Sequence, residues 1–244
     1  QKVLPKGALG GHSMGGGSTV LSAQYGNPAN CYFTFAAATT NPSSVTAAPS
    51  MNKPYLSFGG SRDCIASVAS NQKPMYDASG SPCKFLINIT DGLHCQFGNG
   101  NTQCDLGEFL SLCPSSPLTR SDQINKCLYF LVPFLDYYLK GNCSAWTLFE
   151  QRYATNTDAM ERNCNNSIPT NQYISGDINF CNGTGTTLTA NPSGFNYTWS
   201  DNSTDDQLTV STAGSYSVQI DNGVCTVLAT ATDRKSTRLN SSHT

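Results

Sequence analysis

The chain has 244 residues and a formal net charge of −2, and only 12% of its residues are Asp, Glu, Lys or Arg. This weakly charged composition lacks the basic footprint of a nucleic-acid-binding protein. The longest apolar run, CLYFLVPFLDYYL (127–139), is interrupted by Pro133 and Asp136 and is too short to span a bilayer. The length suits one large domain, or a medium domain followed by a small one.

The first predicted elements are a buried strand and a helix joined by a tight turn. GALGGHS (7–13) is a run of small and apolar residues that suits a parallel strand, and MGGGSTVLSAQYG (14–26) follows as a helix. Between them, Gly11–Gly15 has the pattern G-x-S-x-G, which holds a serine at a strained strand-to-helix turn. The motif predicts that Ser13 is a nucleophile. The alternative is a glycine-rich turn with an inert serine.

Three further apolar runs of strand length follow. They are CYFTFAAA (31–38), KPYLSFGG (53–60) and CKFLINIT (83–90), and a helical segment at 66–78 lies between the last two. Continuous apolar strands that alternate with helices indicate a parallel sheet covered on both faces, and so an α/β fold. Only about fourteen residues separate the first two runs, which is an ordinary connection rather than a helical lid. We therefore expect an open site.

A nucleophilic serine needs a base, and the chain has three histidines. His12 lies beside Ser13 in the turn, and we expect its side chain to point away from the serine. His243 is in the C-terminal tail, which leaves His94 in the loop after the strand at 83–90. A surface histidine without a catalytic role is the alternative.

Two aspartates compete for the role of the catalytic acid. Asp63 follows the strand at 53–60, whereas Asp91 lies three residues before His94 and is expected to cap or turn that loop. The chain order Ser, Asp, His is the one that α/β-hydrolase folds use, so we favour Asp63. The predicted triad is Ser13, His94 and Asp63, with the imidazole as base and the carboxylate as its orienting partner.

The first domain is expected to end at Cys164. Ser121–Lys140 has the pattern of a long amphipathic helix, and Trp146–Tyr153 is expected to pack behind it as a strap. The backbone N–H of Met14 would be one oxyanion donor, and the second donor is expected upstream of Gln1.

The composition changes in the last third of the chain. Residues 165–176 read as a polar linker, and residues 177–232 alternate apolar and polar residues in short pieces between Gly, Asn and Asp turns. This pattern predicts a small antiparallel β-sandwich with Trp199 in its core and a disulfide between Cys181 and Cys225 across its sheets. The segment resembles the Ig-like or PKD-like modules of bacterial extracellular proteins, including those exported by type IX secretion.

The C-terminal tail of the chain has an unusual sequence, which also bears on what precedes Gln1. Residues 233–244 resemble the in-frame translation of a common sequencing adapter, and a genuine basic, disordered tail is the alternative. We leave this tail out of the fold prediction. A read that runs into an adapter is a fragment, so we also expect early strands, the second oxyanion donor and a signal peptide to lie upstream of Gln1.

Eleven cysteines, without CxxC pairs at zinc-finger spacing, indicate disulfides and hence a secreted protein. Buried free thiols in a cytosolic protein are the alternative. The loops that carry Asp63 and His94 converge in an assembled triad, which predicts a bridge between the cysteines that follow them, Cys64 and Cys95. Cys143 with Cys164 is a further candidate pair. The odd total leaves one cysteine for a partner in the upstream part.

Three segments together resemble a known enzyme family. GHSMGGG (11–17), GGSRDCIAS (59–67) and DGLH (91–94) are similar to segments of cutinase-like polyester hydrolases, including poly(ethylene terephthalate) (PET) hydrolases, and of dienelactone-hydrolase-like esterases. The resemblance covers about residues 7–164. It implies the C-terminal half of an α/β-hydrolase domain that works without a cofactor or metal.

The resemblance also implies which residues meet the substrate. Met14 and Ile65 would line the acyl cleft. Thr39 and Thr40 stand where polyester hydrolases carry an aromatic residue, so the stacking surface for a terephthalate ring is missing. We expect short-chain esters and aliphatic polyesters to be better substrates than aromatic polyesters.

Two other functions remain open on the sequence alone. A serine peptidase can use the same triad on the same fold. A surface-binding or adhesion protein would keep the hydrolase half as a remnant and use the sandwich to bind a polymer or glycan surface. The intact set of triad residues favours the secreted ester hydrolase.

Overall fold

The computed structural model describes residues 6–178, 185–212 and 214–232. The adapter-like tail and Cys181 lie outside the described residues. The chain divides into two compact units, of which the first holds residues up to Lys140 and Ser144–Asn166, and the second holds Gly141–Cys143 and the residues from Ser167 onward.

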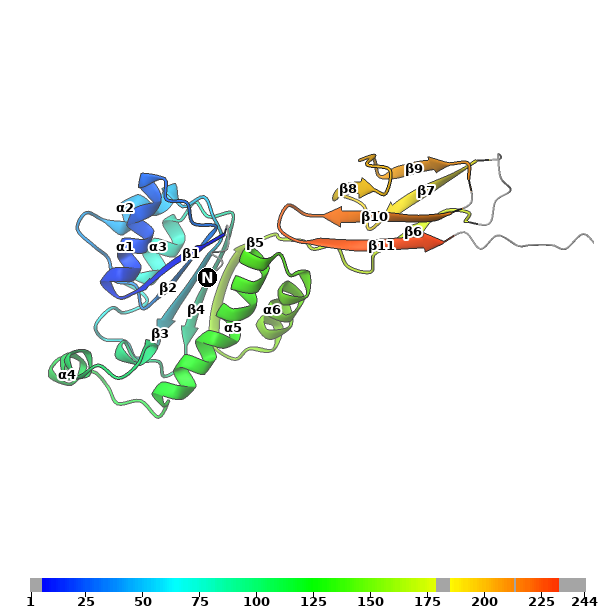
Figure 1. Ribbon diagram of the computed structural model, residues 1–244. Helices are drawn as coiled ribbons and strands as arrows, with labels where there is room; N and C mark the ends of the chain where they lie inside the picture. The colour runs from blue at the N-terminus through cyan, green and yellow to red at the C-terminus, as the bar shows by residue number, and fades with distance from the viewer. Residues whose placement is uncertain (1–5, 179–184, 213, 233–244) are drawn as a thin grey trace, which may run out of the picture. The chain divides into compact units, whose positions relative to one another are not determined.

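The first unit is built on a five-stranded sheet in the order β1-β2-β3-β4-β5 (Figure 1). Its strands are β1 (Ala8–His12), β2 (Cys31–Phe35), β3 (Tyr55–Gly60), β4 (Cys83–Ile89) and β5 (Ala159–Cys164). The first four strands are parallel, and β5 pairs with β4 in the antiparallel sense. Every residue of β3 is buried, as expected for a strand covered on both faces. The predicted α/β unit with a mostly parallel sheet is confirmed.

Helices cover both faces of this sheet (Figure 1). One face carries α1 (Met14–Ser22), α2 (Ser44–Ala47) and α3 (Gln72–Ala78), together with the short 3-10 helices η1 (Ala23–Tyr25) and η2 (Ala48–Ser50). Val20, Met51, Tyr55 and Met75 are fully buried in the core on this side.

The opposite face carries α5 (Arg120–Lys140) and α6 (Cys143–Thr155). Their aromatic side chains pack against β4, where the ring of Phe85 lies 4.8 Å from that of Phe149, centroid to centroid, and Phe149 stacks on Trp146 at 5.3 Å. The segment predicted as a strap at 146–153 is therefore part of a helix. It packs behind α5, where the ring of Phe149 lies 5.7 Å from that of Phe130, centroid to centroid.

Two elements between β4 and α5 were not predicted. They are the 3-10 helix η3 (Cys95–Phe97) and the helix α4 (Thr102–Leu110), which has no buried residue. Figure 1 shows α4 at the end of the sheet toward which β3 and β4 point.

The prediction of disulfides is confirmed, but the predicted pairs are wrong. Cys64 bonds to Cys113 and Cys95 to Cys104, so both cysteines of the Asp63 and His94 loops pair with the α4 segment and not with each other. Their Cα atoms lie 5.5 Å and 5.6 Å from those of their partners, within the usual range for a disulfide.

The other two candidate pairs are corrected as well. Cys164 bonds to Cys83, the residue directly opposite it in the β4–β5 register. Cys143 and Cys225 bond to each other rather than to Cys164 and Cys181. Among the described cysteines, Cys31 and Cys127 are free, and both are buried.

The second unit consists of two three-stranded antiparallel sheets, β11-β10-β8 and β6-β7-β9. The side chains of both sheets meet in one core around Trp199, whose indole N–H donates to the carbonyl oxygen of Asp205 at 2.9 Å. The strands are β6 (Tyr173–Ser175), β7 (Thr186–Asn191), β8 (Asn196–Trp199), β9 (Gln207–Val210), β10 (Ser215–Asp221) and β11 (Thr226–Thr232).

Candidate active site

Ser13 occupies the sharp turn between β1 and α1. Its φ of 54° and ψ of −123° lie in a region that L-residues with a side chain rarely adopt. Backbone hydrogen bonds hold the turn, because Ser13 N–H donates to the carbonyl oxygen of Phe35 at 3.0 Å and Ala38 N–H donates to that of Ser13 at 2.9 Å. The side chain is thereby presented at the carboxyl end of the sheet.

Two glycines near the turn are required by close backbone contacts, Gly11 in the motif and Gly17 beyond it, whereas a Cβ atom at Gly15 would meet nothing within 4 Å. A Cβ atom at Gly11 would lie 2.4 Å from the backbone of Gly15, and one at Gly17 would lie 2.1 Å from the carbonyl oxygen of Ala38. Both distances are far below van der Waals contact. The repeated glycines therefore let α1 pack directly against the turn and β2, as the G-x-S-x-G pattern suggests.

Ser13, His94 and Asp63 form a continuous hydrogen-bonded chain. The Nε2 atom of His94 lies 2.9 Å from Ser13 Oγ, and its Nδ1 atom lies 2.8 Å from Asp63 Oδ2. His94 and Asp63 are buried, with 3% and 5% of their surface exposed. With Asp63 ionised, Nδ1 carries the proton and Nε2 accepts from the serine hydroxyl.

The second oxygen of Asp63 is also occupied. Asp63 Oδ1 accepts the backbone N–H groups of Ile65 at 2.9 Å and Ala66 at 2.7 Å. Both carboxylate oxygens thus have fixed partners, which locks the orientation of the group that faces His94.

The rival acid, Asp91, is engaged elsewhere. It forms an ion pair with the Nε atom of Arg62, and its own N–H donates to Ser61 Oγ at 2.8 Å. Its φ of 60° places it in the turn that follows β4.

The loop that carries His94 is held from three directions. Gln123 on α5 donates to the carbonyl oxygen of Leu93 at 2.8 Å and accepts its N–H at 2.9 Å. Glu108 accepts the N–H of Cys95 at 2.8 Å, and Arg120 donates to the Cys95 carbonyl oxygen. Sequence reasoning missed these supporting residues, because nothing in their spacing connects them with His94.

His12 contacts His94 and therefore lies beside the candidate triad. Its Nε2 atom lies 2.9 Å from the backbone carbonyl oxygen of His94, and the two rings are 4.7 Å apart, centroid to centroid. Sequence reasoning considered only its direction relative to Ser13.

The other predicted site residues lie at the ends of neighbouring strands and helices. Met14 is the first residue of α1, so its N–H belongs to the helix turn that has no intrahelical acceptor. The side chains of Met14 and Ile65 are 70% and 43% exposed. Thr39 is exposed after β2 and bonds to Asn71 Oδ1, and Thr40 donates to the carbonyl oxygen of Pro42 at 2.6 Å.

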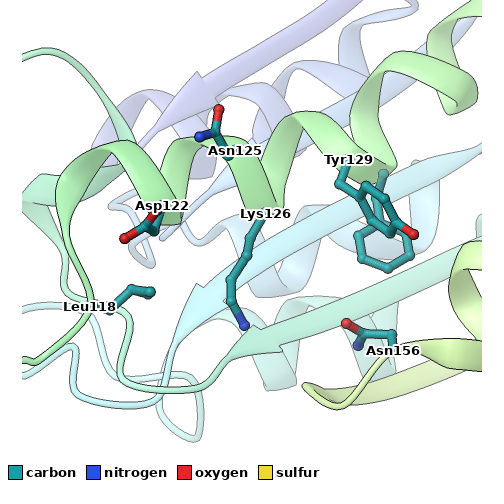
Figure 2. Close-up of a pocket in the computed structure, with 7 residues that line it drawn as sticks. Leu118, Asp122, Asn125, Lys126, Tyr129 and Asn156 are labelled. Carbon is teal, nitrogen blue, oxygen red and sulfur yellow. The ribbon is translucent and has the colours of Figure 1, made fainter.

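The first unit also has a cavity of about 540 Å³ away from these residues. Figure 2 shows Asp122, Asn125, Lys126 and Tyr129 projecting from α5. Lys126 is already paired with the buried Asp158, with its Nζ atom 2.8 Å from Oδ1. The lining residues are Leu118, Asp122, Asn125, Lys126, Tyr129, Phe130 and Asn156.

The comparison with protein families agrees with this geometry. Residues 5–111 match the PETase family model, described as PET hydrolase-like. The matched range contains β1 to β4 and the residues Ser13, Asp63 and His94. The match supports an ester or polyester hydrolase in general, and the five-stranded, mostly parallel sheet fits the α/β-hydrolase fold.

No curated protein has a significant match to the chain. In the described part of the chain, no helix combines the length and the apolar character that crossing a bilayer requires.

Proposed function

We propose that the protein is a secreted serine carboxylic-ester hydrolase that acts on short-chain esters and polyesters. The observation that carries the proposal is the hydrogen-bonded chain from Ser13 through His94 to Asp63, with the serine at a strained strand-to-helix turn. The PETase-like match of residues 5–111 supports the same reaction class. The four disulfides in the described residues support an oxidising location.

The mechanism follows from the three contacts. Ser13 Oγ attacks the ester carbonyl carbon while its proton passes to His94 Nε2. Asp63 stabilises the imidazolium that forms, because its carboxylate accepts a hydrogen bond from Nδ1–H. The Met14 N–H, free in the first turn of α1, donates to the oxygen that becomes negatively charged in the tetrahedral intermediate.

Collapse of this intermediate expels the alcohol, which takes the proton from His94 Nε2, and leaves an acyl group on Ser13 Oγ. A water molecule then attacks the acyl carbon and gives its proton to His94. The ester bond to Ser13 breaks, the serine regains its proton, and the carboxylic acid product leaves.

We assign the substrate cleft to residues that follow β1, β2 and β3 at the carboxyl end of the sheet. Met14 and Ile65 supply apolar contacts, and Thr39 and Thr40 provide no aromatic stacking surface. The connection after β2 contains only the short elements α2 and η2, so a bulky acyl chain can reach the serine. These features favour aliphatic over aromatic polyesters.

The domain organisation that accompanies this function is a catalytic domain over residues 1–164 followed by an Ig-like module. The predicted linker at 165–176 is too long, because it includes β6 (Tyr173–Ser175), which pairs with β7 of that module. Two antiparallel sheets that share one core around Trp199 support the Ig-like assignment. The module would be dispensable for soluble substrates and would contact a polymer or glycan surface.

The decisive experiment identifies the nucleophile directly. The full-length protein is treated with a fluorophosphonate, which forms a covalent bond only with an activated serine, and the modified peptide is identified by mass spectrometry. We expect the label on Ser13, and no label in the Ser13→Ala or His94→Ala variants. The matched control is Ser18→Ala, an exposed serine in the same helix, which should label normally. Robust hydrolysis of p-nitrophenyl butyrate by Ser13→Ala would refute the assignment.

A further inference from the structure

The helix α4 and the turn after it expose large apolar side chains. Leu106 is 52% exposed, Phe109 76%, Leu110 69% and Leu112 88%. Helices of soluble proteins usually turn such residues toward the core and leave their charged residues in water. A cluster of four in one short segment is unusual and indicates a contact surface.

The charged residues of α4 have the opposite orientation. Asp105 pairs with Arg120 at 2.6 Å, and Glu108 accepts the backbone N–H of Cys95 at 2.8 Å. The carboxylates therefore bind the body of the unit, and the apolar side chains face outward. In a core-facing helix the apolar face is buried and the charged face is exposed; in α4 the arrangement is the opposite.

Disulfides fasten this segment at both ends to the loops of the candidate active site. Cys104 bonds to Cys95, which follows His94, and Cys113 bonds to Cys64, which follows Asp63. The four exposed apolar residues all lie between Cys104 and Cys113. The apolar surface is thus covalently continuous with the residues that would carry out catalysis.

We propose that the exposed face of residues 104–113 binds the surface of a solid, apolar polyester and so holds the polymer at the mouth of the active site. This proposal rests on the ester hydrolase function proposed above. The occupant must be apolar, because Leu106, Phe109, Leu110 and Leu112 offer no charge. It must also be brought close to Ser13, because both ends of the segment are tied to the triad loops.

The charge of the segment argues against a lipid membrane. Residues 95–119 contain no Lys or Arg, whereas proteins that bind anionic membrane surfaces place basic residues beside the apolar ones. A weakly charged polymer surface needs no such groups. Met14, which follows Ser13, and Ile65, which follows the bridged Cys64, are further exposed apolar residues.

The test measures adsorption separately from catalysis. The full-length protein in a Ser13→Ala background is mixed with polycaprolactone particles, and the bound fraction is determined by depletion from solution. Phe109→Ser/Leu112→Ser, which changes the two most exposed residues, should adsorb about tenfold more weakly, because apolar surface drives the adsorption. A second pair, Leu106→Gln/Leu110→Gln, should change adsorption in the same direction.

The matched control removes an aromatic residue and a leucine at exposed positions elsewhere. Tyr25→Ser/Leu128→Ser changes residues of the first unit that are 74% and 44% exposed, and it should adsorb as strongly as the unsubstituted protein. With Ser13 restored, Phe109→Ser/Leu112→Ser should hydrolyse p-nitrophenyl butyrate normally but release less product from the particles. The assay with p-nitrophenyl butyrate separates the two proposals. If the unsubstituted protein does not hydrolyse this ester, the hydrolase proposal is refuted, whereas the docking surface is still tested by adsorption in the Ser13→Ala background.

Several results would overturn the docking surface. The proposal would be wrong if the variants of residues 104–113 adsorbed to polycaprolactone as strongly as the control variant. Binding to phosphatidylcholine vesicles in place of polyester would assign the face to a membrane. A dimer in sedimentation analysis that Phe109→Ser/Leu112→Ser dissociates, with adsorption unchanged, would assign it to a second copy of the chain.

Discussion

His12 Nε2 lies 2.9 Å from the backbone carbonyl oxygen of His94. A carbonyl oxygen only accepts hydrogen bonds, so the proton of this bond is on His12 Nε2. His12, which precedes Ser13 in sequence, therefore holds the backbone of His94, whose imidazole faces Ser13. The turn at Ser13 positions both partners of the Ser13–His94 contact.

This relationship predicts different outcomes for two replacements of His12. His12→Gln keeps a side-chain N–H donor, whereas His12→Phe keeps a ring but removes the donor. We expect kcat for a soluble ester to fall about tenfold in His12→Phe with little change in KM, because one hydrogen bond that orients His94 is lost. His12→Gln should recover most of the activity. Steady-state kinetics would contradict the role if both variants matched the unsubstituted protein.

The two aspartates beside His94 provide a matched test of the acid. Asp63→Asn should lower kcat about 10³- to 10⁴-fold, because an amide favours the wrong imidazole tautomer. Asp91→Asn should leave kcat nearly unchanged, since Asp91 pairs with Arg62. The comparison requires only p-nitrophenyl butyrate and both purified variants. The reverse ranking would transfer the acid role to Asp91.

The free cysteines should resist modification in the folded protein. Burial raises the pKa of the Cys31 thiol to about 12 and also raises that of Cys127. The reactive thiolate is therefore scarce at pH 8, where an exposed cysteine would be partly ionised. Iodoacetamide at pH 8 should leave both residues unmodified in native protein and alkylate both in denaturant, as read by peptide mass spectrometry. Rapid native alkylation of Cys31 would show that its environment is open to solvent.

The substrate preference should respond to the end of β2. Thr39→Trp and Thr40→Trp each add a ring near the proposed cleft, and a ring can stack on a terephthalate unit. We expect at least one variant to raise the ratio of aromatic to aliphatic polyester turnover. The released products, quantified by chromatography, give both rates. If neither variant changes the ratio, our description of the cleft is wrong, although the esterase proposal would stand.

The parts of the fold that could be predicted are those whose sequence pattern follows from burial. β2, β3 and β4 lie within the three apolar runs identified in the sequence, because both faces of a central parallel strand are covered. The edge strand β5 has four exposed residues among its six, so it left no comparable apolar run. Its identity depends on pairing with β4, which no local signal encodes.

The candidate site shows the same division. Ser13, Asp63 and His94 were selected from a local motif, the chain order and the small number of histidines, and the structure places them within hydrogen-bond distance. The disulfide partners Cys104 and Cys113 could not be selected in this way. They belong to a segment whose apolar residues face outward. A prediction that places apolar residues in the core therefore cannot show where α4 lies in the fold.

The two bridges to residues 104–113 couple the oxidation state of the chain to the assembly of its site. In a reduced chain, the loops after Asp63 and His94 would be attached to this segment only by noncovalent contacts such as that of Glu108 with Cys95. Oxidation would then complete the acid loop, the base loop and the apolar face in the same chemical event. Maturation of the proposed enzyme would therefore depend on an environment that oxidises thiols.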